Sequence, residues 1–454
     1  MSILLVGAAQ AQWLETTIPV GSNPGALCYN PLNNKVYCAN EGGRVGRVTI
    51  IDGATNQVIT TVAADTTPFD LCYNSVNNRV YSANAVGGDV TVIDGAADSV
   101  IATIRTGLGA DAVCYNTQNN RIYCANGLGN TLTVIDGASD TIIATVVVGR
   151  APRALCYNPQ GNKVYCAVGA NSVAVIDCAT NQVVKSVVTD SQPQAQCYNP
   201  QNDEVYCANS ADNGIGTVTV IDGESDHVVT TVAVGLDPRA LCHNPLDNKV
   251  YCANSGSDNV TVIDGASDTV IATIAAGVLP FGLCHNPQND KVICSNNGSN
   301  DVTVIDGVAD SVLKTIPVGT WPMFMAYNPT QNRVYVSIFD SDSISIIRDS
   351  ALGVAERAPL VGHRLTLEAY PNPFSGQVRL QLTANGLQPE VRIYNVNGVL
   401  ARDLNPTRCL APSFSGSLVW DGTDDLGRRL PTGVYVARLT DGASSVNRKV
   451  MLLP

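Results

Sequence analysis

The chain has 454 residues, which is enough for two or three ordinary domains. Asp and Glu outnumber Lys and Arg by 39 to 27, and this acidic balance without basic clusters argues against binding to nucleic acid or to anionic membranes. Only 15 % of the residues are charged, while glycines number 39 and prolines 23, a composition typical of many short strands joined by tight turns.

The first eleven residues, 1–11, are expected to be the end of a secretory signal peptide. Residues 3–9 form a short apolar run, and Ala9-Gln10-Ala11 fits a small-x-small cleavage site. The positively charged segment that opens such signals is missing, so we expect the natural start to lie upstream. No later stretch has the roughly 18 consecutive apolar residues of a spanning helix. These features predict export through the periplasm and no transmembrane segment.

A unit of about 42 residues repeats over residues 12–350. Its landmark is CYNPLNNKVYCAN at residues 28–40, and the last copy has diverged. The copies begin at Cys28, Cys72, Cys114, Cys156, Cys197, Cys242, Cys284 and Ala326. Self-similarity at this period is typical of a β-propeller or a solenoid.

Each repeat contains four short runs rich in Val, Ile, Thr and Tyr, bounded by Asn, Asp, Gly or Pro, which is the pattern of β-strands. The eighth repeat has only three runs. The missing run stands at the other end of the chain, where WLETTIPV at residues 13–20 matches VLKTIPV at 312–318. The sequence therefore predicts an all-β fold, an eight-bladed β-propeller closed by its N-terminal strand.

The repeat KVYCANSGSDNVTVIDGASDTVIATIAAG at residues 249–277 resembles the YVTN repeat family of surface-layer and secreted propellers, with Cys mostly in place of the second Val of that motif. The resemblance covers about three quarters of the chain. It implies a propeller and an extracellular location. Seven blades are usual in that family, whereas three separate landmarks in this chain each count eight.

Residues 351–363 are predicted to be a linker, followed at 364–454 by a small Ig-like β-sandwich with seven strand candidates. Its motifs resemble the C-terminal sorting domain of the type IX secretion system, which is similar to the Ig-like domain of flagellar hook-cap proteins. This resemblance implies the export machinery as a partner and a secreted or cell-surface protein. The residues that carry it are Pro371, Asn372, Pro373, Asn397, Gly398, Trp420, Asp421, Gly422, Gly433, Tyr435 and Lys449.

Twelve cysteines of the repeats form pairs ten residues apart. They are Cys28/Cys38, Cys114/Cys124, Cys156/Cys166, Cys197/Cys207, Cys242/Cys252 and Cys284/Cys294. In an exported protein such pairs can form one disulfide per blade, across the first hairpin. If Asn33 holds the left-handed position of a three-residue loop, however, the thiols share a face but lie diagonally, roughly 7 Å or more apart at Cα. Small buried thiols packed between blades are the alternative.

The sequence contains no recognisable catalytic or metal-binding motif. His243 and His285 stand where other repeats have Tyr, which predicts packed rings. The Asp that ends each third run predicts an Asx-type turn, because it lacks the dense oxygens of a calcium loop. No phosphate loop, HExxH or haem CxxCH motif is present. We therefore expect no catalytic residues, no cofactor and no metal.

One position varies strongly between repeats, directly after the Pro (Ala110 in the third repeat) that precedes each first run. Its residues are Gly25, Phe69, Asp111, Arg153, Gln194, Arg239, Phe281 and Met323. In a propeller this position lies at the mouth of the central channel. Loops on a rigid scaffold commonly carry function, which predicts a mixed aromatic and cationic ligand-binding rim. The predicted rim residues are Phe69, Arg153, Gln194, Arg239, Phe281, Trp321 and Met323. Random variation on a solvent-exposed surface is the alternative.

These features favour an exported, non-enzymatic propeller that binds an unknown extracellular protein or polysaccharide, or acts as a scaffold. The alternative is a propeller enzyme, lactonase-like or polysaccharide-active, with its site at the channel mouth; a purely structural surface-layer role is a third possibility. Two or more inward Asp, Glu or His at the mouth would favour the enzyme. A channel lined by small residues would favour binding, and the expected ones are Ala26, Ala112, Ala154, Ala195, Ala240 and Gly282.

Overall fold

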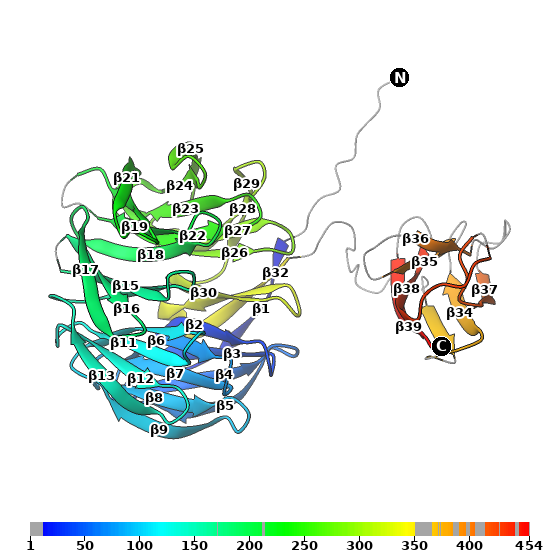
Figure 1. Cartoon of the computed structure of the whole chain (residues 1–454), viewed down its shortest axis with the longest axis horizontal. Coiled ribbons are helices and arrows are strands. Elements are labelled where there is room, and N and C mark those ends of the chain that lie inside the picture. The colour runs from blue at the N-terminus through cyan, green and yellow to red at the C-terminus, as the bar shows by residue number, and fades with distance from the viewer. Residues whose placement is uncertain are drawn as a thin grey trace. The chain divides into compact units, whose positions relative to one another are not determined.

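Figure 1 shows the computed structural model of the chain. It describes residues 12–169, 171–210 and 214–349, and in the C-terminal region 366–370, 372, 374–384, 390–395, 400–404, 414–425, 427–440 and 445–453. The predicted signal peptide (1–11) and linker (351–363) lie outside the described residues. The chain divides into two units, Ala11–Ser350 and a C-terminal unit, which are described separately.

The described residues of the first unit form eight four-stranded antiparallel sheets, the blades of a β-propeller (Figure 1). Blades 1 to 4 are β2 Pro24–Asn30, β3 Lys35–Asn40, β4 Arg47–Asp52, β5 Gln57–Ala63; β6 Pro68–Asn74, β7 Arg79–Asn84, β8 Asp89–Asp94, β9 Ser99–Arg105; β10 Ala110–Asn116, β11 Arg121–Asn126, β12 Thr131–Asp136, β13 Thr141–Val147; and β14 Ala154–Asn158, β15 Lys163–Val168, β16 Ser172–Asp177, β17 Gln182–Val188.

Blades 5 to 8 follow the same order, from the innermost strand outward, except that the last blade takes its outer strand from the N-terminus. They are β18 Pro193–Asn199, β19 Glu204–Asn209, β20 Thr217–Asp222, β21 Val228–Ala233; β22 Pro238–Asn244, β23 Lys249–Asn254, β24 Asn259–Asp264, β25 Thr269–Ala275; β26 Pro280–Asn286, β27 Lys291–Asn296, β28 Asp301–Asp306, β29 Ser311–Pro317; and β30 Pro322–Asn328, β31 Arg333–Ile338, β32 Ser343–Asp349, β1 Gln12–Pro19. Two short 3-10 turns, η1 Ser255–Ser257 and η2 Phe339–Ser341, join strands in blades 6 and 8.

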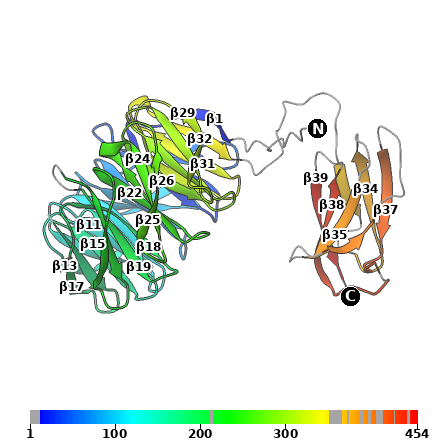
Figure 2. The same cartoon turned by 90° about the horizontal axis from the view of Figure 1, so that it is seen from above.

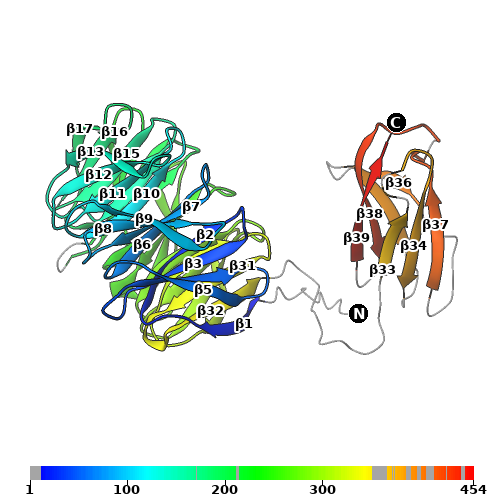
Figure 3. The same cartoon turned by 90° about the horizontal axis from the view of Figure 1, so that it is seen from below.

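The ring is closed as the sequence predicts. Strand β1 pairs antiparallel with β32, and Figure 3 shows β1, in blue, beside the yellow β32. Glu15 in β1 accepts a hydrogen bond from the guanidinium of Arg333 in β31, with Nε and Oε2 2.7 Å apart. The innermost strands β2 and β30 also contact each other, so the first and last blades are neighbours.

A buried asparagine ends each innermost strand and links its blade to the next. Its side-chain NH2 donates to the side-chain oxygen of the hairpin residue one blade on, over 2.7–3.0 Å. The links are Asn30–Asn78, Asn74–Asn120, Asn116–Asn162, Asn158–Asp203, Asn199–Asn248, Asn244–Asp290, Asn286–Asn332 and Asn328–Asn34. The last link returns to blade 1, so these bonds form a closed ring. All eight donors are 0 % exposed, which makes each bond costly to lose.

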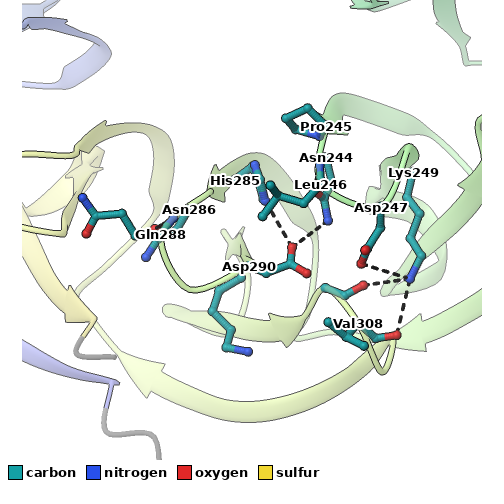
Figure 4. A network of polar contacts seen from close by, with 12 residues as sticks. Asn244, Pro245, Leu246, Asp247, Lys249, His285, Asn286, Gln288, Asp290 and Val308 are labelled. Carbon is teal, nitrogen blue, oxygen red and sulfur yellow. Dashed lines mark hydrogen bonds and ion pairs between the residues drawn. The ribbon is translucent and has the colours of Figure 1, made fainter. Parts of the chain in front are cut away.

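The hairpin residues that accept these bonds have left-handed backbones, with φ between 49° and 56°. Asn and Asp tolerate this region better than other residues with a side chain, which explains why one of them stands there in every repeat. His285 confirms the prediction of a packed ring substitute, because its Nε2 lies 3.3 Å from Oδ1 of Asp290, where other blades place a Tyr hydroxyl (Figure 4).

Ion pairs reinforce the same interfaces. Lys249, at the start of β23, places its Nζ 2.8 Å from Oδ2 of Asp310 in the next blade. The hydroxyl of Tyr251 donates to the same carboxylate over 2.9 Å. Equivalent cation–carboxylate pairs between blades are Lys35–Asp98, Arg79–Asp140 and Lys163–Asp226. Because these pairs are largely buried, they depend on the surrounding hydrogen bonds for their stability.

The structure contradicts the disulfide alternative. In blade 1, Cys28 lies opposite Tyr37, so the following residue Cys38 points to the other face of the sheet. Cys28 packs with Leu71 of blade 2, whereas Cys38 packs with Tyr335 of blade 8. The cysteines of the described residues are free thiols. The same register excludes Cys28/Cys38, Cys114/Cys124, Cys156/Cys166, Cys197/Cys207, Cys242/Cys252 and Cys284/Cys294 as pairs.

The diagonal arrangement of the two thiols, expected if Asn33 holds the left-handed position of a three-residue loop, is also wrong. In the structure Asn34 holds that position, with φ 51°, and Asn30 pairs with Lys35 across a four-residue loop. A shift of one residue turns every side chain of a strand to the opposite face. The thiols therefore pack between blades, and burial raises the pKa of each.

The C-terminal unit contains two sheets, ordered β33-β34-β37 and β36-β35-β38-β39 in its described part (Figure 2). The strands are β33 Thr366–Tyr370, β34 Val378–Ala384, β35 Glu390–Asn395, β36 Leu400–Asp403, β37 Phe414–Trp420, β38 Gly433–Thr440 and β39 Ser445–Leu452. Buried side chains from both sheets, among them Val378, Ile393 and Trp420, form one core. This arrangement is a small β-sandwich, as predicted.

Several of the residues that carry the resemblance to sorting domains have structural roles in this sandwich. Trp420 is fully buried and packs edge-on against Tyr435, with ring centroids 5.2 Å apart. Asp421 accepts hydrogen bonds from Thr423 in the turn that contains Gly422, and Asn372 accepts one from the Met451 backbone. Gly433 opens β38, and Lys449 lies in β39. Pro371, Pro373, Asn397 and Gly398 lie outside the described residues.

We expect the Glu15→Gln variant to unfold more easily than the wild-type protein. Arg333 is buried, and replacing its charged partner weakens a charge-assisted hydrogen bond, which costs about 2 kcal/mol. Urea unfolding of the propeller checks this, with the exposed Glu224→Gln as the matched control. Equal midpoints for both variants would show that this ion pair does not hold β1 in the last blade.

Candidate functional site

The innermost strands begin at the end opposite the asparagine ring, and their first residues have an unusual backbone. The residue before each entry Pro adopts a left-handed φ, between 49° and 64°. These residues are Asn23, Thr67, Ala151, Gln192, Asp237, Leu279 and Trp321. Thr, Leu and Trp rarely adopt this conformation, and such strain persists only where the surrounding fold imposes it.

A β-bulge follows at the position that varies between repeats. In blade 2, Pro68 pairs with Asn84 and Asp70 with Ala83, so Phe69 between them has no partner in the ladder. Asp111, Gln194, Arg239 and Phe281 occupy the same place in their blades. A bulge frees a residue from pairing and changes the direction of its side chain. The sequence located this position but gave no sign of the bulge.

These side chains meet in a cavity of about 460 Å³. The varying position contributes Phe69, Asp111, Arg153, Gln194, Arg239 and Phe281, from six consecutive blades. Small residues line it as expected, namely Ala112, Ala154, Ala195, Ala240 and Gly282. Ala26 of blade 1 is not part of the lining. The structure therefore brings together most of the predicted rim.

Trp321 and Met323 do not belong to the cavity lining, contrary to the prediction. Blade 8 contributes Phe324 and Met325 to the lining, at the positions that Gly282 and Leu283 occupy in blade 7. Trp321 lies against Phe339, with ring centroids 6.4 Å apart.

Two carboxyl groups from adjacent blades line the cavity. Asp70 stands where other blades have Ala, Gly or Phe, and its oxygens accept the backbone N–H groups of Leu71 and Val113, each over 2.9 Å. It thereby ties β6 to β10. Burial raises the pKa of Asp70 to about 6, although these hydrogen bonds act in the opposite direction.

Asp111 has different surroundings. Burial raises its pKa to about 6, and the positive charge of Arg153 opposes that rise. A Cβ at Gly127 would collide with Oδ2 of Asp111, so a larger residue there would force the carboxylate to move. The charge of Asp111 is therefore balanced by the Arg153 side chain, whereas that of Asp70 is stabilised by backbone N–H groups.

The blades that follow contribute cationic groups to the cavity. Arg153 is exposed, and its Nη1 lies 3.4 Å from Oε1 of Gln194. Arg239 is also exposed and forms an ion pair with Asp237, with Nη2 and Oδ2 2.9 Å apart. The hydroxyl of Ser210 donates to Asp237 over 2.6 Å and fixes that carboxylate. Both guanidinium groups therefore keep donor N–H groups for a ligand.

Aromatic side chains complete the lining between these two sides. Phe281 and Phe324 meet edge to face, with ring centroids 5.4 Å apart and an interplanar angle of 81°. Phe69 is 40 % exposed. Around the ring, the cavity thus passes from carboxyl groups in blades 2 and 3 to guanidinium and amide groups in blades 4 to 6, and then to aromatic rings in blades 7 and 8.

Gln196 is a lining residue that the sequence analysis missed. It stands opposite Cys207, where the other seven repeats have an apolar residue. Both its amide atoms are buried and have no hydrogen-bond partner among the described residues. The sequence alone could have revealed this exception, because the residues at the same position of the other repeats are all apolar. They are Leu27, Leu71, Val113, Leu155, Leu241, Leu283 and Met325. Burying an amide without hydrogen bonds is costly, so Gln196 is a polar exception in an otherwise apolar position.

Other features that the sequence singled out have structural roles. The Asp of the third-strand turn forms the predicted Asx turn; for example, Asp52 accepts the N–H groups of Ala54 and Thr55. Within the described residues, no group of three or more His, Cys, Asp or Glu side chains is placed to hold a metal ion. No helix in this part of the chain is long and apolar enough to cross a membrane.

Comparisons with known proteins support the fold. No protein-family model and no curated protein matches the chain. Similar solved structures include the Dos1 propeller (12 % identity, TM-score 0.63, 75 % of this chain and 96 % of that one). The dihydro-heme d1 dehydrogenase NirN in complex with DHE (16 %, 0.58, 74 % and 75 %) and Kuenenia stuttgartiensis hydrazine synthase (21 %, 0.52, 63 % and 96 %) also match. These similarities show the propeller fold alone.

We expect the Gln196→Leu variant to be more stable than the wild-type protein. Leucine restores the apolar residue of the other blades and removes two unpaired polar atoms, which gains about 1–2 kcal/mol. Urea unfolding measures the difference, with Gln194→Leu, at the half-buried rim position of the same strand, as the control. A lower unfolding midpoint for Gln196→Leu would mean that the amide has partners in the free protein.

Proposed function

We propose that this protein is an exported, non-enzymatic β-propeller that binds a small ligand, or the end of a larger one, in the cavity at its channel mouth. The observation that carries the proposal is the convergence of the varying position of six consecutive blades on one cavity. Elsewhere the repeats keep nearly the same residues, so the fold does not require this variation. The volume of the cavity lies within the range of about 300–1,000 Å³ that is typical of small-molecule sites.

Rigid presentation supports binding. The strained entry turns and bulges are held by the blades, and the asparagine ring links the far ends of the same strands. A ligand then meets side chains that are already in place, which lowers the entropy lost on association. Exposed arginines and aromatic rings are the residue types that contribute most to binding energy.

An enzyme is the second candidate, because two inward carboxyl groups line the mouth. Asp70 is poorly suited to act as a base or nucleophile, since both its oxygens accept backbone N–H groups. Asp111 alone cannot supply the paired acid and base that carboxylate-based hydrolysis requires. The carboxyl groups fit better as ligand-binding groups, so we favour binding over catalysis.

Export and sorting rest on the sequence. The Ala-x-Ala site near the start and the resemblance of the C-terminal region to type IX sorting domains support delivery to the cell surface or medium. The resemblance of the repeats to YVTN propellers supports the same location. We propose that the export machinery recognises the C-terminal unit, which is then cleaved or anchored.

A thermal-shift screen of the full chain tests binding at the channel mouth. The panel contains neutral and acidic sugars, amino acids and short peptides. We expect at least one compound to raise the melting temperature of the wild-type protein. The same compound should stabilise the control variant Leu32→Trp, which changes an exposed residue in a first-hairpin loop. It should not stabilise Gln194→Trp, because the larger side chain narrows the mouth of the cavity. A panel without any shift, or equal shifts in all three proteins, would refute the proposed site.

Intact mass tests export. We expect the protein recovered from the culture medium or cell surface to lack residues 1–11, and cleavage during sorting would also remove the C-terminal unit. Protein found only inside cells, with both ends retained, would contradict the extracellular location.

A further inference from the structure

The chemistry of the cavity narrows the class of ligand. We propose that the channel mouth binds a sugar acid, a monosaccharide unit that carries one carboxylate, with the carboxylate on Arg153 and Arg239 and the sugar ring beside Phe281. This inference rests on the proposed binding function and names the ligand of that site.

The cationic side selects the charge of the ligand. Arg153 and Arg239 lie in blades 4 and 6, with Gln194 between them in blade 5. Guanidinium groups present parallel N–H donors that match a carboxylate, and the Gln194 amide adds another donor. A neutral ligand would leave these donors without an anionic acceptor. The arrangement therefore favours one anionic group on this side of the cavity.

The remaining sides select the rest of the ligand. The carboxyl groups of Asp70 and Asp111 can accept hydrogen bonds from hydroxyl groups and would repel a second anion. The Phe281 and Phe324 rings offer an apolar surface to the C–H face of a sugar. A polyphosphate, an amine or a purely apolar compound would satisfy only part of this lining.

The lining also makes binding depend on pH. The charged or titratable groups near the Asp111 carboxyl are Arg153 from blade 4 and the Cys124 thiol of its own blade, and Asp70 from blade 2 lines the same cavity. Burial raises the pKa of Cys124 to about 12, so that thiol stays neutral. The pKa values of Asp70 and Asp111 are both about 6. Above that pH the Asp111 carboxylate competes with a ligand for Arg153, and below it Arg153 is released from that competition.

The sign of the effect follows from these charges. Acidification from pH 7.5 to pH 5.0 protonates Asp111 and Asp70, whereas a sugar carboxylate stays largely ionised. Binding of the sugar acid should therefore tighten several-fold over this range. Binding of the neutral parent sugar should change little, because it places no charge beside the arginines.

The test uses the full chain and matched pairs of sugars. The pairs are glucuronate with glucose, galacturonate with galactose and mannuronate with mannose, each titrated by ligand-observed NMR at pH 7.5 and pH 5.0. We expect at least one acid to bind tenfold or more tightly than its parent sugar, with the advantage larger at pH 5.0. The double variant Arg153→Gln/Arg239→Gln should lose that advantage while keeping the wild-type melting temperature, since both side chains are exposed.

A variant that is expected to bind the acid more tightly distinguishes a specific effect on the site from general damage to the protein. Asp111→Asn mimics the protonated carboxyl and should bind the acid several-fold more tightly than wild type at pH 7.5, with a flattened pH profile. If no acid surpasses its parent sugar while another compound of the thermal-shift panel binds at the mouth, the sugar-acid inference is wrong and the binding function stands. If nothing binds at the mouth, the binding function itself is wrong.

Discussion

The eight hydrogen bonds between buried asparagines and the hairpins of the following blades are the constraint on which the rest of the structure depends. Each bond satisfies an amide that the neighbouring blade seals from water, so a blade cannot move away without exposing an unpaired polar group. The chain of bonds returns from Asn328 to Asn34, residues 294 positions apart. With β1 inserted beside β32, the ring has no free end.

The two ends of each innermost strand have different tasks. At the asparagine end, regular pairing and ion pairs between blades make the interfaces nearly identical around the ring. At the other end, left-handed entry residues and bulges interrupt the pairing and free one side chain per blade. The stability supplied at the first end allows strain and variation at the second, which is where the cavity lies.

The cavity combines groups that oppose one another in the free protein. Asp111 lies beside Arg153, Arg239 is held by Asp237, and the amide of Gln196 is buried without a partner. None of these features improves the packing of the propeller, and the other blades do without them. Groups that are unfavourable in the free protein but matched to a ligand are characteristic of binding sites, where function rather than stability selects the residues.

The sequence by itself determined the repeat, the strand positions and the closure by the first strand, because each is a local pattern of about six residues repeated along the chain. It also located the varying position, since Arg153 and Phe281 differ where their neighbours agree. Only the tertiary structure decided which face each cysteine occupies, because one residue more in a hairpin reverses every side chain. The same holds for the cavity, whose lining comes from seven blades and depends on bulges that leave no local signature.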